Sequence, residues 1–256
     1  VRPVGAAFTN DGTLSVGAGA PLVLKQGTKT LGGTVSGAGT LVLGFGTDAT
    51  LNTASVTVAA LSLAGGNGGA TLRLGTSLTY AGAFSFANQF DVLQLNGKTL
   101  TLSGASNTLI GNQVNGAGTL RVTGTATVGG NISFGTSYGT STPMTLQNSG
   151  TINQTGSISL NGTLLNDAGR TYALLAASDI TNTGSGGAIV NNGTFFDKAP
   201  GTSTISGAFT NNGKLLIGTG STLVINQGVK TLGGEITGNG KLVFGGELLK
   251  RDTPGF

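Results

Sequence analysis

Short runs of alternating apolar and polar residues recur along the chain, and a small polar turn introduces each run. The recurring phrase is a turn closed by Gly, then Thr or Lys, then Leu, Val, Ile or Phe at alternate positions. Gly and Asn supply the positive φ of a tight turn, and a period of two forms a strand with one buried face. The phrases lie at Asn10–Val16, Gly37–Leu43, Gly116–Val122, Asn148–Ile152, Asn161–Leu165 and Asn191–Phe196.

Each phrase predicts a turn followed by a strand of roughly four to six residues. Further strands are expected at Leu22–Leu24, Val56–Ala64, Thr71–Leu74 and Lys98–Leu102. No segment predicts a convincing helix, and Tyr172–Ile180 fits a strand or an excursion equally well. The phrases are weakest from Thr47 to Asp91, where the run Gly65–Gly69 predicts a loop.

One long segment occurs twice. Phe8–Gly44 returns as Phe209–Gly245 at an offset of 201 residues, and the two copies match at 21 of 37 positions without a gap. The match includes the unbroken block Lys29–Gly33 against Lys230–Gly234. Such identity indicates duplication, and a repeat of this kind determines the choice of fold.

The spacing of the phrases favours a coil of stacked turns. Gly213 and Gly240 lie 27 residues apart, and Gly193 and Gly213 lie 20 apart. A parallel β-solenoid of roughly 20–27 residues per turn fits, since its turns stack at ~4.8 Å and a motif recurs at the turn spacing. Small residues then suit the tight corners, and Asn can stack in ladders that satisfy its own amide groups. A sandwich of hairpins and a transmembrane β-barrel are the alternatives, and the sandwich leaves the repeat unexplained.

We therefore predict one all-β, elongated parallel β-solenoid domain over residues 1–256. The two copies are expected in equivalent turns, with Leu31–Gly33 and Leu232–Gly234 at equivalent corners. If the offset makes ten turns, the copies lie roughly 48 Å apart along the axis.

Composition narrows the function. The 256 residues include 48 Gly but no Trp, Cys or His, and only 9% are charged, which is unlike an ordinary enzyme. A hydrophobic fraction of 38% argues against disorder. The net charge of +4 is scattered, so no basic stripe for nucleic acid is expected. Lack of Cys excludes disulfides and thiolate metal sites. No stretch approaches the roughly 18 apolar residues of a membrane helix.

Candidate catalytic groups are few. Asp179 and Asp197 could stand on neighbouring turns beside Arg170 and Lys198, as in some carbohydrate-cleaving β-helices, although solvated turn residues would look the same. Lys98 imitates the end of a phosphate loop, but the required earlier Gly is a Val. The Gly-x-Gly pairs, Gly17/Gly19 and Gly218/Gly220, are interpreted as turns.

Other ligand-binding motifs are also weak. The run Gly65–Gly69 resembles a calcium-binding repeat but lacks its aspartate. Four sequons, headed by Asn131, Asn153, Asn161 and Asn192, are expected by chance in a chain rich in Asn-Gly-Thr. Thr pairs that could form an ice-binding hydroxyl array lie at Thr99/Thr101, Thr123/Thr125/Thr127 and Thr202/Thr204. We expect no catalytic residue, cofactor or metal.

The phrases Asn-Asn-Gly-Thr-Phe, Gly-Ala-Gly-Thr-Leu and Asn-Gly-Lys-Thr-Leu-Thr-Leu-Ser-Gly resemble those of bacterial surface passengers of the autotransporter and filamentous-haemagglutinin type. The resemblance spans nearly the whole chain. It implies a right-handed parallel β-helix, exported to the extracellular side or the cell surface, that serves as an adhesin or as its stalk. A carbohydrate-active enzyme and a carbohydrate- or ice-binding module remain the alternatives.

The ends of a solenoid bear on its partners. The sequence begins at Val1 without Met, which suggests a processed or excised chain. Repeat phrases run from Phe8 to Gly245 and leave only the tails Val1–Ala7 and Gly246–Phe256 to cover exposed strand edges. We expect further turns in a longer parent or end-to-end association of copies, besides surface glycans or proteins as partners.

Overall fold

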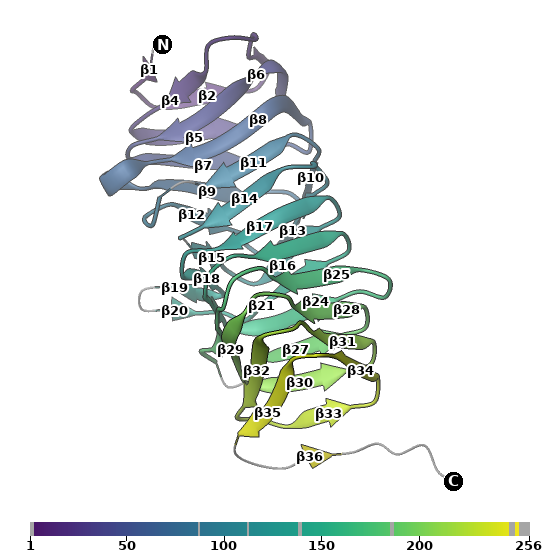
Figure 1. Cartoon of the computed structure of the whole chain (residues 1–256). Helices are drawn as coiled ribbons and strands as arrows, with labels where there is room; N and C mark the ends of the chain where they lie inside the picture. The colour runs from purple at the N-terminus through teal and green to yellow at the C-terminus, as the bar shows by residue number, and fades with distance from the viewer. Residues whose placement is uncertain are drawn as a thin grey trace.

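A computed structural model describes residues 3–86, 88–111, 113–137, 140–184, 187–245 and 249–250. The chain winds into an elongated stack of about 11 turns of about 21 residues each, and the first strand lies at one end of the stack and the last at the other (Figure 1). Strands account for 62% of the residues. The predicted all-β parallel solenoid is confirmed, and the sandwich is excluded because successive turns pair in parallel.

Three sheets run along the stack, and we name them sheets A, B and C. Sheet A consists of β1 (Pro3–Val4), β3 (Thr13–Ser15), β4 (Leu22–Leu24), β6 (Thr34–Gly44), β8 (Val56–Ala64), β11 (Ala83–Phe86), β14 (Asn107–Ile110), β17 (Thr125–Gly129), β22 (Thr151–Gln154), β25 (Thr171–Leu174), β28 (Thr194–Asp197), β31 (Lys214–Ile217) and β34 (Glu235–Gly238). Sheet B consists of β2 (Phe8–Asn10), β5 (Gly27–Leu31), β7 (Thr47–Leu51), β9 (Ala70–Leu74), β12 (Val92–Gln94), β15 (Gln113–Asn115), β18 (Ile132–Phe134), β23 (Ile158–Leu160), β26 (Ile180–Asn182), β29 (Gly201–Ser206), β32 (Ser221–Asn226) and β35 (Lys241–Gly245).

Sheet C consists of β10 (Leu78–Tyr80), β13 (Lys98–Leu102), β16 (Gly118–Val122), β21 (Met144–Asn148), β24 (Gly162–Asn166), β27 (Ala188–Asn191), β30 (Ala208–Asn211), β33 (Lys230–Leu232) and β36 (Leu249–Lys250). Outside the three sheets lie a short antiparallel pair, β19 (Thr136–Ser137) with β20 (Thr140–Ser141), and a 3-10 turn at Gly66–Gly68. The pair projects from the side of the stack (Figure 1). No helix in the described part of the chain is long and apolar enough to cross a membrane.

Beyond the first turns, the chain passes from sheet C to sheet A to sheet B and back to sheet C. In the first turns, β6 and β8 bend around a corner, so their first halves occupy the side that sheet C takes over. The bend shows as a register shift between Gly37 and Thr40. The strand β10 continues this side of the stack, and its Tyr80 hydroxyl donates to the Val58 carbonyl oxygen on β8 at 3.0 Å.

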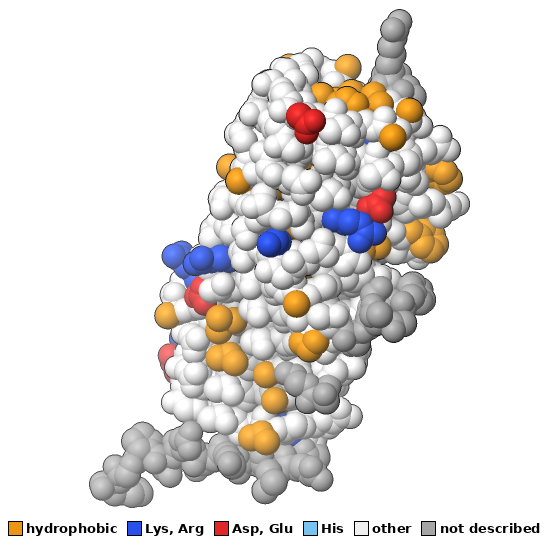
Figure 2. Space-filling view, turned by 180° about the vertical axis from the view of Figure 1, so that it is seen from behind, with side chains coloured by type: hydrophobic (Ala, Val, Ile, Leu, Met, Phe, Trp, Pro, Cys, Tyr) orange, Lys and Arg blue, Asp and Glu red, His pale blue; other side chains and the backbone are white. Residues whose placement is uncertain are grey.

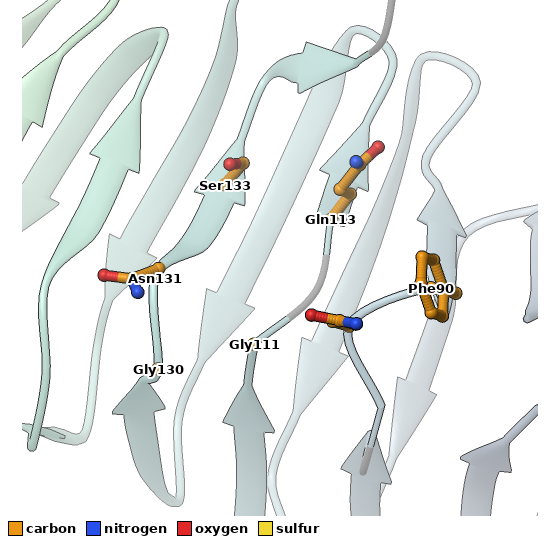
Figure 3. Close-up of a pocket in the computed structure, with 7 residues that line it drawn as sticks. Phe90, Gly111, Gln113, Gly130, Asn131 and Ser133 are labelled. Atoms are coloured by element: carbon orange, nitrogen blue, oxygen red, sulfur yellow. The ribbon is translucent and has the colours of Figure 1, made fainter. Parts of the chain in front are cut away.

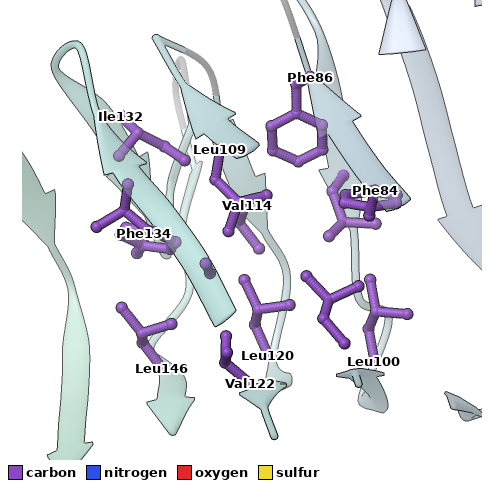
Figure 4. Packing of buried hydrophobic residues seen from close by; sticks show 14 of the residues in the cluster. Phe84, Phe86, Leu100, Leu109, Val114, Leu120, Val122, Ile132, Phe134 and Leu146 are labelled. Atoms are coloured by element: carbon purple, nitrogen blue, oxygen red, sulfur yellow. The ribbon is translucent and has the colours of Figure 1, made fainter. Parts of the chain in front are cut away.

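The interior is filled by columns of apolar side chains. On sheet C, Leu100, Leu120 and Leu146 are register partners on successive strands and are fully buried. Figure 4 shows them in a row, with side chains of the other two sheets, among them Leu109 and Val114, packed above them. Because the strand period is two, residues between these positions point outward. The apolar face of each turn is therefore buried by side chains of all three sheets and by the neighbouring turns (Figure 4).

An asparagine ladder ends four consecutive strands of sheet C, as the sequence predicted. The side-chain amide of Asn148 donates to Asn166, that of Asn166 to Asn191, and that of Asn191 to Asn211, at 2.7, 2.7 and 2.6 Å. All four side chains are fully buried. Each amide also donates to a carbonyl oxygen one turn further on, such as that of Lys214 for Asn191 at 3.0 Å.

Glycine follows the ladder position because the turns touch there. A Cβ on Gly124 would lie 2.0 Å from the Gly104 carbonyl oxygen, and one on Gly150 would lie 2.2 Å from that of Gly124. No side chain fits at such distances. At Gly124–Thr125 and Gly150–Thr151 the Gly-Thr step thus marks the corner where sheet C passes into sheet A, whereas at Gly118–Thr119 and Gly162–Thr163 it begins a strand of sheet C.

The two copies of the duplicated segment have the same local structure. Asn10 donates to the Thr34 carbonyl oxygen and Asn211 to that of Glu235, both at 3.2 Å. The prediction of equivalent corners is nevertheless wrong. Phe8 lies on sheet B and Phe209 on sheet C, so the copies are displaced by one side of the solenoid.

The displacement follows from the length of the turns. From β2 to β29 there are ten strands of sheet B, or nine turns, and β30 adds one further side. The offset of 201 residues is thus nine and a third turns, not ten, or about 45 Å at ~4.8 Å per turn. Turns differ in length: Asn107 pairs with Ala126, 19 positions on, and Ile132 with Ile158, 26 positions on. The longer turn contains β19 and β20.

The other strand predictions are largely confirmed. Val56–Ala64 and Lys98–Leu102 are strands with these bounds. The stretch from Thr47 to Asp91, expected to be weak, carries regular strands, and its loop is confined to the glycine run around Gly66–Gly68. Tyr172–Ile180 divides into the end of β25, a loop, and the first residue of β26.

Candidate functional site

The two candidate carboxylates lie on opposite faces of one wall. Asp197 is fully buried and accepts a hydrogen bond from the hydroxyl of Ser203, also fully buried, on β29. Asp179 is exposed and accepts one from the backbone N–H of Thr204 at 3.0 Å. Since Ser203 and Thr204 are neighbours on a strand, their side chains point to opposite sides. The sequence-based pairing of Asp179 with Asp197 is therefore wrong.

Asp197 ends a buried polar network inside the solenoid. Tyr172 donates to the Gln154 side chain at 2.6 Å, Gln154 to Ser178 at 3.2 Å, and the Ser178 backbone N–H to the Ser203 hydroxyl at 3.3 Å. Burial raises the pKa of Asp197 to about 6, and the Ser203 hydrogen bond opposes the shift. The second oxygen of Asp197 has no hydrogen-bond partner.

The positive residues proposed to accompany this pair do not share its environment. Arg170 and Lys198 are both exposed, whereas Asp197 faces the interior. A general acid and a general base must reach one substrate, and this arrangement offers no common surface. The buried network accordingly has a structural role.

Two lysines also lie inside, and sequence reasoning missed both. The Lys29 side chain is fully buried, and its ammonium group donates to the carbonyl oxygens of Ala6, Lys25 and Gln26. Burial lowers its pKa. Lys230, the same position in the second copy, is also buried and donates to the Gly245 carbonyl oxygen at 3.0 Å. The shared Lys-Thr-Leu-Gly-Gly block thus places a lysine inside each copy.

The buried Asp91 side chain holds the loop formed by the run Gly65–Gly69. It is fully buried, and one carboxylate oxygen accepts the backbone N–H groups of Gly65 and Ala70, both at 2.9 Å. Burial raises its pKa, and hydrogen bonds from the backbone oppose the shift. Asp91 directly follows the exposed Phe90, so this anchor fixes the loop that presents the Phe90 ring.

The remaining sequence candidates are structural positions. Lys98 begins β13 after a tight turn in which Asn96 and Gly97 have φ of 52° and 75°, so no helix follows as a phosphate loop requires. Gly17/Gly19 and Gly218/Gly220 lie in loops between strands. No three His, Cys, Asp or Glu residues gather as a metal site among the residues that the structure describes.

The predicted Thr pairs do not combine into one array. Thr99/Thr101 lie on sheet C, Thr125/Thr127 on sheet A, and Thr202/Thr204 on sheet B, with Thr123 in the turn before β17. The structure instead aligns Thr99, Thr119, Thr145 and Thr163 in an outward column on sheet C, and Thr125, Thr151, Thr171 and Thr194 in another on sheet A. An ice-binding plane needs hydroxyls in two dimensions on one face, and these two columns lie on different sheets.

The sequons differ in accessibility. Asn131 is exposed, Asn153 and Asn192 are half-buried, and Asn161 is buried with its amide donating to the Gly135 carbonyl oxygen at 2.9 Å. Burial of Asn161 removes it as an acceptor of a glycan. Asn131 has another distinction, because its φ of 61° turns the chain at the corner between sheets A and B.

That corner contains a groove of about 380 Å³ over three consecutive turns. Its lining consists of Gln89, Phe90, Gly111, Gln113, Gly130, Asn131 and Ser133. Figure 3 shows Phe90, Gln113 and Ser133 on neighbouring turns, with Asn131 and the two glycines at the adjoining corner. Gln113 and Ser133 are direct register partners, so their side chains stand side by side.

The two glycines lie where neighbouring turns approach closely at this corner. Gly111 and Gly130 both have positive φ, 69° and 64°. A Cβ on Gly130 would lie 2.6 Å from the Ile110 side chain and 3.1 Å from the Gly111 backbone nitrogen. Among the residues that the structure describes, no charged side chain lines the groove, and the polar groups of the lining are amides and a hydroxyl. Phe90 is 46% exposed.

Charge is sparse on the outer surface generally. On the face in Figure 2, a few Lys, Arg, Asp and Glu side chains, some of them in contact with one of opposite charge, lie on a largely uncharged surface. Two ion pairs are formed in the described part of the chain, Arg73 with Asp48 and Lys214 with Glu235. Any recognition by this surface therefore depends on neutral polar and apolar contacts.

Comparisons with known proteins return no match: no family model, no curated protein and no solved structure is significantly similar to this chain.

Proposed function

We propose that the chain is a non-enzymatic structural and adhesive protein of the extracellular space or bacterial cell surface. The observation that carries the proposal is the stack itself, in which three continuous parallel sheets form an elongated body with a solid interior and a sparsely charged exterior. Such a body displays many modest contact sites along its length. The sequence resemblance to surface passengers of the autotransporter and filamentous-haemagglutinin type supports the same role.

The placement of the carboxylates favours this role over a carbohydrate-cleaving enzyme. Asp197 is inside the wall and Asp179 outside, so they cannot flank one glycosidic bond. The test combines attachment with turnover. Purified chain should bind cell surfaces saturably and release no sugar from a panel of polysaccharides. Polysaccharide cleavage by the wild type that Asp179→Asn abolishes would overturn the proposal.

The last described turn supports association through the end of the stack. Ile236 and Phe244 are 42% and 37% exposed, whereas their register partners one turn earlier, Leu215 and Ile225, are fully buried. The inward-facing column thus continues to an open apolar end, which a further turn or the end of another copy would cover. We propose that end-to-end contact is one partner mode.

Light scattering against concentration tests this mode. We expect the wild type to form rods that lengthen with concentration, and Phe244→Asp to reduce their mean length. Phe45→Asp is the matched control, because Phe45 is equally accessible at 50% but lies on the side of the stack. A wild-type particle of constant monomeric mass, or equal shortening by both variants, would contradict the mode.

A further inference from the structure

We propose that the groove between sheets A and B binds a neutral oligosaccharide, with Phe90 as its stacking platform. The inference rests on the proposed adhesive function and adds to it a site and a class of ligand. It begins from the chemistry of the lining. A pyranose ring has an apolar face of C–H groups and a rim of hydroxyls that both donate and accept hydrogen bonds. A binding site for it needs an exposed ring and neutral groups of both kinds.

The groove supplies both. Phe90 presents an aromatic ring that is nearly half exposed, and aromatic faces attract C–H edges. Gln113 and Asn131 each carry an amide with donor and acceptor atoms, and Ser133 adds a hydroxyl. Asn115 donates to the Gln113 side-chain oxygen at 3.2 Å, which orients that amide. The NH₂ group of Gln113 then remains available to donate to a ligand.

The absence of charge from the lining selects among ligands. The described lining residues include no Lys, Arg, Asp or Glu. An acidic sugar, a phosphate or a nucleic acid would find no cation to pair with, and a cationic ligand would find no carboxylate. Neutral hydroxyl groups suit the amides and the serine. The chemistry therefore favours neutral hexoses and N-acetylhexosamines.

The shape favours a short chain over a single sugar. The lining residues come from the three turns that carry β12, β15 and β18. Turns stack at ~4.8 Å, so the groove extends along the solenoid axis for about the length of two or three linked sugar rings. Gly111 and Gly130 leave the backbone open to close approach, as ligand sites often require.

The site is held rigidly, which lowers the entropy lost on binding. The buried Asp91, next to Phe90, accepts the backbone N–H groups of Gly65 and Ala70 at 2.9 Å and fixes the loop of the aromatic ring. Asn131 donates its backbone N–H to the Ser157 carbonyl oxygen at 2.9 Å, in the next turn. Both sides of the groove are thus anchored to neighbouring turns. Asp91 is a positioning residue and does not line the groove.

The experiment is a calorimetric titration of the whole chain with neutral trisaccharides, namely oligomers of glucose, mannose and N-acetylglucosamine, and with the acidic trigalacturonate. We expect saturable binding of at least one neutral trisaccharide, unchanged between about 0.05 and 0.5 M NaCl because no ion pair is involved. Trigalacturonate should bind more weakly. Salt-sensitive binding of trigalacturonate alone, or saturation by none of the neutral sugars, would overturn the proposal.

Three variants assign the binding to the groove. Phe90→Ala should weaken it roughly tenfold, the upper range for one aromatic contact. Asn131→Gly removes an amide while keeping the positive φ, and should weaken binding severalfold. Phe45→Ala is the matched control, because Phe45 is an equally exposed ring at the same corner, packed over Gly68 outside the groove. Circular dichroism confirms that each variant is folded. Equal affinity of wild type and Phe90→Ala, or equal loss in Phe45→Ala, would sink the assignment.

A cell-attachment arm separates this inference from the proposed function. If the groove binds surface glycans, free trisaccharide should displace the chain from cells and Phe90→Ala should attach less. Attachment that persists with no response to sugar or to Phe90→Ala would overturn the groove and leave the adhesive function standing. If the wild-type chain does not attach to cells at all, that result would count against the adhesive function as well. If purified extracellular polysaccharide displaces the bound chain, whereas cells stripped of that polysaccharide do not compete for it, the ligand belongs to the secreted polysaccharide.

Discussion

Replacing Asn191 by Ala should destabilise the middle of the asparagine ladder strongly. The Asn191 side chain is fully buried, accepts from Asn166 at 2.7 Å, and donates to Asn211 at 2.6 Å and to the Lys214 carbonyl oxygen at 3.0 Å. Ala removes all three bonds. It also leaves the Asn211 side-chain oxygen without this donor in a dry interior.

The magnitude follows from the buried groups. Two of the lost hydrogen bonds contribute about 1 kcal/mol net each, and the third leaves a buried acceptor unsatisfied at a cost of about 1–3 kcal/mol, so the unfolding free energy should fall by about 3–5 kcal/mol. Asn192→Ala is the matched control on the neighbouring residue. Asn192 forms the same amide-to-amide contact with Asn212, at 2.9 Å, but on the exposed side. Its loss should cost less than about 1 kcal/mol.

Urea unfolding followed by circular dichroism measures both variants, and amide hydrogen exchange locates the effect. Because each turn contacts only its neighbours, protection should fall most in β24, β27 and β30, which share the ladder. An Asn191→Ala midpoint that equals that of Asn192→Ala would refute the reasoning, as would a loss of protection spread evenly over all turns.

Two further predictions concern a buried acid and a corner glycine. Burial raises the pKa of Asp197 from 3.8 to about 6, so the folded state binds more protons than the unfolded state between these values, and stability falls as pH rises from about 4 to 6. Asp197→Asn should flatten this pH dependence in urea midpoints measured across the range. An unchanged slope would exclude Asp197 as its source. Gly124→Ala should destabilise the stack by several kcal/mol, because its Cβ would lie 2.0 Å from the Gly104 carbonyl oxygen. Gly12→Ala should be near neutral, because no atom lies within 4 Å of the new Cβ. Equal urea midpoints for the two variants would contradict the close contact at Gly124.

The fold could be predicted from the sequence because its cause is local and repeated. The turn at Asn191–Gly193 and the alternation that follows it specify a corner and a strand, and their recurrence requires stacked turns. The Asn ladder was predictable for the same reason. The bounds of β13 match the predicted run Lys98–Leu102.

The candidate sites were less predictable because they depend on register between turns. In the run Thr194–Asp197, both Phe195 and Phe196 are apolar, so alternation alone does not choose the inward face. The structure buries Phe195, and Asp197, two residues on, therefore also faces inward. The groove combines residues such as Phe90 and Gln113 from different turns, whose pairing depends on turn lengths that vary between 18 and 26 residues along the chain.

The two displaced copies show that a duplicated local sequence does not determine which side of the solenoid a segment occupies. Lys29 and Lys230 lie inside equivalent local structures, yet one is on sheet B and the other on sheet C. A segment that contacts only its neighbouring turns keeps its conformation on any side of the solenoid. Recognition depends instead on which side chains the accumulated register brings to one corner. Leu100, Leu120 and Leu146 share one buried column although 20 and 26 residues separate them, so the loops absorb changes in turn length and the strands keep their faces. An insertion in the loop that carries Phe90 would therefore leave the strands in register and still move the Phe90 ring relative to the Gln113 amide, so the groove is more sensitive to insertions than the fold is.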